Sequence, residues 1–197
     1  MLFPAIEFAA RAHAGQYRKG TRLPYIVHPL AVASILIEAG CPEAMVVAAL
    51  LHDTVEDTAV TLDDIRGTFG DEVVRLVEAA SEPDQGARWE QRKRHTMEHL
   101  HTAPADVLLL ACADKLDNIR SIRRDLDLHG DVAWSRFSRP MEKQRWYYQT
   151  LAGILTARLT EEPGRGLARH LADDVARVFG EHAAGTTASG ETTDVPG

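Results

Sequence analysis

AMVVAALLHDTVED, residues 44–57, is the stretch that decides the fold. Its first eight residues are apolar, so the helix that they predict has no polar face and belongs at the centre of a protein. The helix then runs into four ionisable side chains: His52, Asp53, Glu56 and Asp57. Burying such groups costs free energy unless they are paired or bound to a metal ion. The stretch therefore predicts a core helix with a functional site at its end.

A second stretch repeats this pattern further along the chain. ADVLLLACADKLDNIRSIRRDL, residues 105–126, is apolar in its first half and continues with Asp114, Lys115 and Asn118. Asp114 and Asn118 are four residues apart, so they share one face of a helix. We therefore expect two central helices that each end in polar groups.

The rest of the chain predicts an all-α fold. Apolar residues recur at helical spacing, and no long run alternates with period two. Thr61 and Asp64 form an acidic variant of the capping box, which marks the start of a short helix. We expect one helical bundle over residues 1–181 and a polar, disordered tail over 182–197. The expected helices cover residues 2–14, 29–39, 42–57, 71–81, 88–101, 105–126, 131–160 and 166–180, and a loop covers 15–29.

Composition narrows the class of protein. The 197 residues carry a formal net charge of −7, which argues against binding to nucleic acid or an anionic membrane. Two cysteines, Cys41 and Cys112, are too few for a disulfide framework and indicate a reducing compartment. No apolar run approaches the roughly 20 residues of a membrane span, and the N-terminus does not resemble a signal peptide. We expect a cytoplasmic protein, and the sequence leaves its oligomeric state open.

The ionisable groups suggest a metal centre. Together, His28, His52, Asp53 and Asp114 offer two imidazoles and two carboxylates to one divalent ion. Such a mixed set suits Mn²⁺, Fe²⁺ or Zn²⁺ better than Ca²⁺. A single buried histidine is more often a hydrogen-bonded core residue than a ligand. The arrangement as a whole favours the metal.

Three segments resemble the HD-domain metal phosphohydrolases: His28, LLHDTVEDT at 50–58 and ADKLDNIRS at 113–121. More narrowly, they resemble the hydrolase domains of Rel/Spo-type alarmone enzymes and their short stand-alone relatives. The resemblance implies a single HD-domain helical bundle. It also implies a Mn²⁺ ion held by His28, His52, Asp53 and Asp114, with Glu56 and Asp57 as the pair that orients and deprotonates the attacking water.

The same resemblance implies a small-molecule nucleotide substrate. The family removes the 3′-pyrophosphate from guanosine tetra- or pentaphosphate, giving GDP or GTP and pyrophosphate. By resemblance, the substrate-binding residues are Arg18, Lys19, Tyr25, Lys115, Asn118 and Ser121, with Arg18 stacking on the base. The loop RKGTRLPYIVH, residues 18–28, is one residue longer than the Rel-type pattern, which leaves the placement of its basic pair open.

Two other functions fit the same residues. One is a phosphohydrolase of another nucleotide, such as one that removes the 2′-phosphate of NADPH. The other is a nucleotide-binding sensor without turnover. The sequence also leaves open whether Glu56 or Asp57 is the base, and whether Tyr147, which is expected in the core, reaches the ligand.

Overall fold

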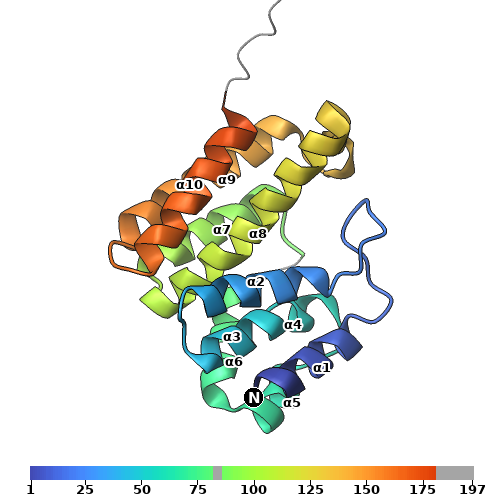
Figure 1. Cartoon of the computed structure of the whole chain (residues 1–197), viewed down its shortest axis with the longest axis vertical. Coiled ribbons are helices and arrows are strands. Elements are labelled where there is room, and N and C mark those ends of the chain that lie inside the picture. Colours follow the sequence, from blue (N-terminus) through green and yellow to red (C-terminus); the bar gives the residue numbers. More distant parts are fainter. Residues whose placement is uncertain (82–85, 181–197) are drawn as a thin grey trace, which may run out of the picture.

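The protein is an all-α bundle in a computed structural model that describes residues 1–81 and 86–180. Within these ranges the only β-type pairing is an isolated bridge between Tyr17 and Pro24. Figure 1 shows the arrangement of the helices, which are α1 (Leu2–Ala12), α2 (Val27–Glu38), α3 (Glu43–Leu51), α4 (Thr54–Asp57), α5 (Leu62–Phe69), α6 (Asp71–Ala80), α7 (Trp89–Thr102), α8 (Ala105–His129), the 3₁₀ helix η1 (Gly130–Arg136), α9 (Met141–Arg158) and α10 (Gly164–Phe179).

The apolar helix α3 lies at the centre of one half of the bundle. Every residue from Met45 to Leu51 is buried. Helices α1, α2 and α6 pack around it, which explains why it needs no polar face. The capping box of Thr61 and Asp64 is present at the start of α5, as expected. The predicted core helix is therefore confirmed as far as Leu51, and its predicted continuation to Asp57 is interrupted at His52 and Asp53, after which α4 begins.

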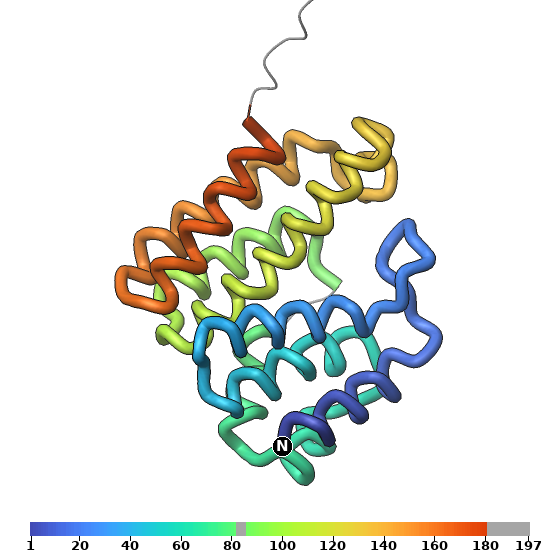
Figure 2. Tube along the Cα trace, viewed as in Figure 1, coloured from blue at the N-terminus to red at the C-terminus, as the bar shows by residue number. Residues whose placement is uncertain are grey.

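Helix α8 connects the two halves of the bundle. It packs against α2 and α6 of the first half and against α9 and α10 of the second. Figure 2 shows α1–α6 on one side of α8 and α9 and α10 on the other, and α7 packs against α9. Three arginines of α8 and α10, Arg120, Arg123 and Arg177, form ion pairs with the buried Asp174 of α10. Polar residues on this shared helix can therefore face groups from both halves.

The helix predicted over 131–160 is wrong in its first third. The chain leaves α8 at Gly130, whose φ of +59° is one that residues with a side chain rarely adopt. It then forms η1, and α9 begins only after Pro140. Proline lacks the N–H that a helix interior requires, so Pro140 sets this start.

Smaller differences concern the start of α2 and the tail. The predicted loop over 15–29 ends earlier, because α2 begins at Val27 and Pro29 lies in its first turn, where its missing N–H costs nothing. His28 therefore sits on a helix. The predicted polar tail, residues 182–197, lies outside the described residues. No helix in the described part of the chain is long and apolar enough to cross a membrane.

Candidate active site

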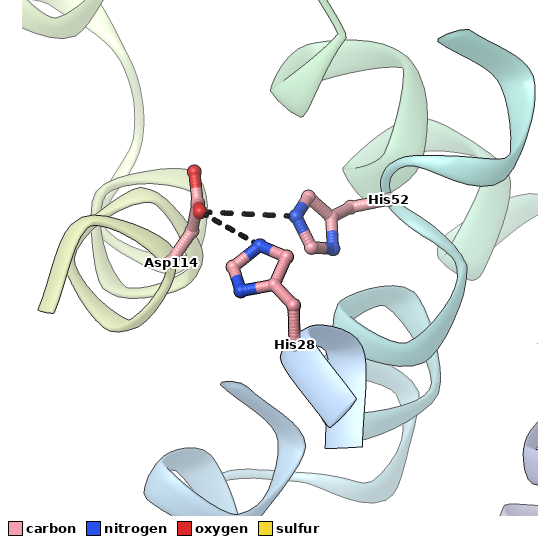
Figure 3. A group of neighbouring side chains, drawn as sticks. All are labelled: His28, His52 and Asp114. Atoms are coloured by element: carbon pink, nitrogen blue, oxygen red, sulfur yellow. Dashed lines mark ion pairs between the residues drawn. The ribbon is translucent and has the colours of Figure 1, made fainter. Parts of the chain in front are cut away.

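Three helices bring one donor side chain each to the same place. His28 comes from the first turn of α2, His52 from the end of α3 and Asp114 from the middle of α8. One ligand atom from each residue lies within 4.8 Å of the others, and all three residues are buried (Figure 3). This is the separation that a single bound cation would bridge.

Both imidazoles are held so that Nε2 faces the centre of this cluster. His52 Nδ1 lies 2.8 Å from the carbonyl oxygen of Ala49, and His28 Nδ1 lies 2.7 Å from Asp117 Oδ2. A histidine that donates from Nδ1 keeps the lone pair of Nε2 for a ligand. The buried Nε2 of His52 indeed forms no hydrogen bond with any described residue. An orphaned nitrogen of this kind fits a metal ligand.

Asp53 adds a second carboxylate to the cluster. Its Oδ1 lies 3.2 Å from His52 Nε2, and its Oδ2 lies 3.5 Å from His28 Nε2. Tyr25 donates a hydrogen bond of 2.6 Å to Oδ2, which fixes the carboxylate. The side chains that the sequence singled out as ligands therefore meet, and their two nitrogens and two carboxylates fit a divalent ion.

The cluster has strongly perturbed pKa values. Burial alone would raise the pKa of Asp114, but the Lys115 ammonium and the two histidines hold it well below its usual range. Burial lowers the pKa of His28, but hydrogen bonds to Asp114 and Asp117, with the charge of Asp53, outweigh this and raise it to about 9. In the absence of a cation, a proton on His28 therefore compensates the carboxylates.

Two further carboxylates lie in the short helix α4, one turn beyond His52. Glu56 is half-buried and Asp57 is exposed. Partial desolvation of the Asp57 carboxylate and the negative charge of Asp53 raise the pKa of Asp57. The backbone of Asp57 also accepts a hydrogen bond of 2.6 Å from Gln16. Helix α4 thus places two acids beside the ligand cluster. The raised pKa of Asp57 makes its carboxylate a better general base.

A cavity of about 170 Å³ opens beside the cluster. Arg18 spans its wall, donating to Asp117 Oδ2 at 3.3 Å and to Asn118 Oδ1 at 3.1 Å. Asn118 in turn donates to Asp114 Oδ1 at 2.6 Å. The cavity is therefore connected to the ligand cluster by direct hydrogen bonds. Its lining residues are Arg18, Lys19, Tyr25, Asn118, Ile122, Arg136, Phe137 and Tyr148.

Two of the predicted substrate residues lie elsewhere. Lys115 contacts Asp114 Oδ2 at 2.5 Å and lines a different cavity of about 180 Å³, together with His95 and His99 of α7. Ser121 is buried in α8 and does not line the first cavity. Lys115 and Asn118 are three residues apart and so lie on neighbouring positions of α8, yet they line different cavities.

The structure also adds residues that the sequence did not single out. Asp117 contacts both His28 and Arg18. In the sequence it is visible only as one more acidic residue in the polar stretch that begins at Asp114. Arg136 and Phe137 reach the first cavity from the segment after α8. Both Tyr147 and Tyr148 are buried, but only Tyr148 lines this cavity. The Lys93 ammonium lies 5.1 Å from the centre of the Tyr147 ring.

Comparison with known proteins gives a consistent picture. Residues 5–137 match the family model of the HD domain. The human guanosine-3′,5′-bis(diphosphate) 3′-pyrophosphohydrolase MESH1 is 41% identical over 156 residues, which cover 78% of this chain and 84% of MESH1. A probable GTP pyrophosphokinase of Mycobacterium leprae is 44% identical over 122 residues, and this match spans 60% of the chain but only 15% of that longer protein.

A solved structure supports the same assignment. A metazoan ortholog of SpoT, which hydrolyzes ppGpp, superposes with a TM-score of 0.73 at 28% identity, over 91% of this chain and 95% of that one. Both the sequence and the fold of this chain are thus similar to those of these proteins. The chain therefore belongs to the HD-domain family and, within it, to the Rel/Spo-type group that includes MESH1.

Proposed function

We propose that this protein hydrolyses guanosine tetra- and pentaphosphate at the 3′ position, giving GDP or GTP and pyrophosphate. The observation that carries the proposal is the convergence of His28, His52, Asp53 and Asp114 beside a cavity lined by basic and aromatic side chains. The similarity to MESH1, which bears this activity in its name, supports the choice of substrate.

We propose Mn²⁺ as the cofactor, held by His28, His52, Asp53 and Asp114, and Fe²⁺ or Zn²⁺ would suit the same donors. When bound, such an ion supplies positive charge to the phosphoryl oxygens and acidifies coordinated water. The fixed tautomers of His28 and His52 prepare both Nε2 atoms to coordinate. Tyr25 holds Asp53 in place.

We assign the proton transfer to helix α4. Glu56 or Asp57 accepts a proton from the attacking water, whose oxygen forms the new bond to phosphorus while the bond from phosphorus to the ribose 3′ oxygen breaks. The leaving 3′ oxygen takes up a proton from solvent and becomes the 3′ hydroxyl of the product. Arg18, fixed by Asp117 and Asn118, binds the nucleotide next to this point. Lys115 acts through Asp114, because its ammonium contacts that carboxylate and keeps it ionised.

A product assay tests the proposal. Purified protein with Mn²⁺ is given guanosine tetraphosphate or NADPH, and released pyrophosphate and orthophosphate are measured. Pyrophosphate from the guanosine compound is the expected result. Orthophosphate from NADPH would favour the alternative phosphohydrolase, and nucleotide binding without either product would favour a sensor.

A further inference from the structure

The first cavity has a basic wall built from two segments that are distant in the sequence. Arg18 and Lys19 come from the loop after α1, and Arg136 comes from the end of η1. A Cβ atom built on Gly20 would lie 2.7 Å from Arg136 Cβ, so the tip of the loop rests directly on Arg136. No acidic side chain lines this cavity among the described residues.

The two arginines are only partly compensated. Arg136 forms an ion pair with Asp125, and its guanidinium lies 4.8 Å from the centre of the Phe137 ring. A guanidinium has five N–H donors, so one such pair leaves most of them available. Arg18 and Arg136 line the same cavity, and burial together with the nearby charge of Arg18 lowers the pKa of Arg136. An anion placed between them would relieve their repulsion.

The position of Asp125, the α8 partner of Arg136, indicates which part of a nucleotide Arg136 meets. Asn118, Ile122 and Asp125 lie four, eight and eleven residues beyond Asp114, or about 6, 12 and 16 Å along the helix axis at 1.5 Å per residue. Asn118 and Ile122 line the cavity, and Arg136 is held at the level of Asp125. The cavity therefore runs from the ligand cluster toward Arg136.

A 3′,5′-substituted nucleotide matches this layout. If its 3′ phosphoryl group lies at the ligand cluster, the nucleoside occupies the middle of the cavity and the 5′ phosphates reach the far end. We propose that Arg136 is a specificity-determining residue that binds the 5′ phosphate groups of the substrate. This inference rests on the proposed function, and it adds the residue that would distinguish nucleotides with 5′ phosphates from those without.

Binding measurements without metal test the proposal independently of turnover. The affinities of GDP and guanosine are measured by calorimetry for the wild type, Arg136→Gln and Arg136→Lys. We expect Arg136→Gln to weaken GDP binding by about tenfold or more, the usual worth of hydrogen bonds to a charged group, and to change guanosine binding less than about twofold. Arg136→Lys, which keeps the charge, should recover part of the loss.

Arg139→Gln is the matched control. It removes the same charge three residues further on, where Arg139 pairs with Glu90 at 3.6 Å and does not line the cavity. GDP binding should be unchanged in this variant. An equal loss of GDP and guanosine binding in Arg136→Gln, or no loss of either, would overturn the proposal.

A measurement on the wild type covers the case in which Arg136→Gln does not fold. The side-chain N–H signal of Arg136, identified by its absence from Arg136→Lys, is followed by NMR. GDP should shift it and guanosine should not. A response to both ligands, or to neither, would count against 5′ phosphate recognition.

Kinetics separate this inference from the proposed activity. With Mn²⁺, Arg136→Gln should raise the KM for guanosine tetraphosphate and leave kcat nearly unchanged, with little effect on guanosine 3′-diphosphate, which has a free 5′ hydroxyl. If the wild type hydrolyses neither compound but GDP binding still depends on Arg136, only the activity is wrong. If both compounds are hydrolysed and Arg136→Gln impairs them equally, only the role of Arg136 is wrong.

Discussion

The ligand cluster and the basic cavity are neighbours, but they are built differently. His28, His52 and Asp114 are buried on helices, and a second contact fixes each of them. The cavity wall comes from a loop and a 3₁₀ segment, and Lys19 at its edge is exposed. Helices hold a chemical group in place, whereas loops accept substitution at little cost to the fold. We therefore expect changes in the cavity wall to affect selectivity more than the chemistry.

The largest effect should come from removing a ligand. Asp53→Ala should abolish turnover and bound metal together, because it removes one donor and leaves Tyr25 without its acceptor. Elemental analysis and the pyrophosphate assay measure the two quantities. Asp127→Ala, at an exposed position of α8, is the control and should change neither. Turnover that survives loss of the metal would exclude the proposed role of Asp53.

The next effect separates binding from catalysis. Replacing the proton acceptor should lower kcat by a factor of about 10² to 10⁴, since a carboxamide cannot accept the proton. Glu56→Gln and Asp57→Asn are compared at equal metal content, and nucleotide affinity should persist in both. The variant with the larger loss identifies the base. Wild-type kcat in both variants would exclude α4 from the mechanism.

Asp117→Asn tests the boundary between the two regions. The amide should weaken metal binding by about 10 to 100-fold, the usual cost of losing the partner of a metal-bound histidine. It should also weaken nucleotide binding, because Arg18 loses an ion pair of 3.3 Å. Calorimetry with Mn²⁺ and with GDP measures both, and Asp127→Asn is the control. Loss of metal binding alone would mean that the two regions are independent.

In metal-free protein, the pH dependence of stability should reveal the protonation of His28 in the ligand cluster. The pKa of His28 is raised to about 9 in the folded state, against an unperturbed value of 6.5. The folded state therefore binds this proton more tightly, so its stabilisation is complete below pH 6.5 and is lost as the pH rises to about 9. The Tm of chelator-treated protein, compared with that of His28→Asn, should show this loss. A constant difference between the two proteins across this range would contradict it.

The smallest effect concerns the loop that rests on Arg136. Gly20→Ala combines a positive φ of +73° with a contact of 2.7 Å to Arg136 Cβ. Gly15→Ala is the matched control, since it has a φ of +80° and no neighbour within 4 Å. Both should lose about 1 kcal/mol of stability through the backbone. Only Gly20→Ala should raise the KM for guanosine tetraphosphate, and equal KM values in the two variants would show that the loop tip does not shape the cavity.

Much of the fold followed from local patterns. The buried helices and the capping box at Thr61 depend on residue types at helical spacing, which a single sequence displays. The donor cluster was indicated by ionisable groups that follow apolar helices, although its members meet only through the packing of three helices. The break after α8 depends on one glycine at positive φ and on Pro140, and the periodicity of the surrounding residues masked both. A short interruption of this kind is difficult to see when helical spacing continues on either side.

The missed site residues share a physical reason. Arg136 and Phe137 join the cavity through contacts between segments more than a hundred residues apart, which no local pattern reveals. Asp117 was visible as an acid, but its two contacts depend on where α8 lies relative to α2 and the loop. Conversely, the family resemblance grouped Lys115 with Asn118 as substrate-binding residues, although the two side chains line different cavities.

One buried carboxylate gives the protein a property that neither region has alone. Asp117 Oδ2 is shared by a ring nitrogen of His28, at 2.7 Å, and the guanidinium of Arg18, at 3.3 Å. Any ligand that draws Arg18 away redistributes the charge on this oxygen and alters the basicity of the imidazole. Binding free energies are reciprocal, so an ion on the imidazole must change the affinity for that ligand by the same factor. Occupancy of the ligand cluster is thereby linked to occupancy of the cavity.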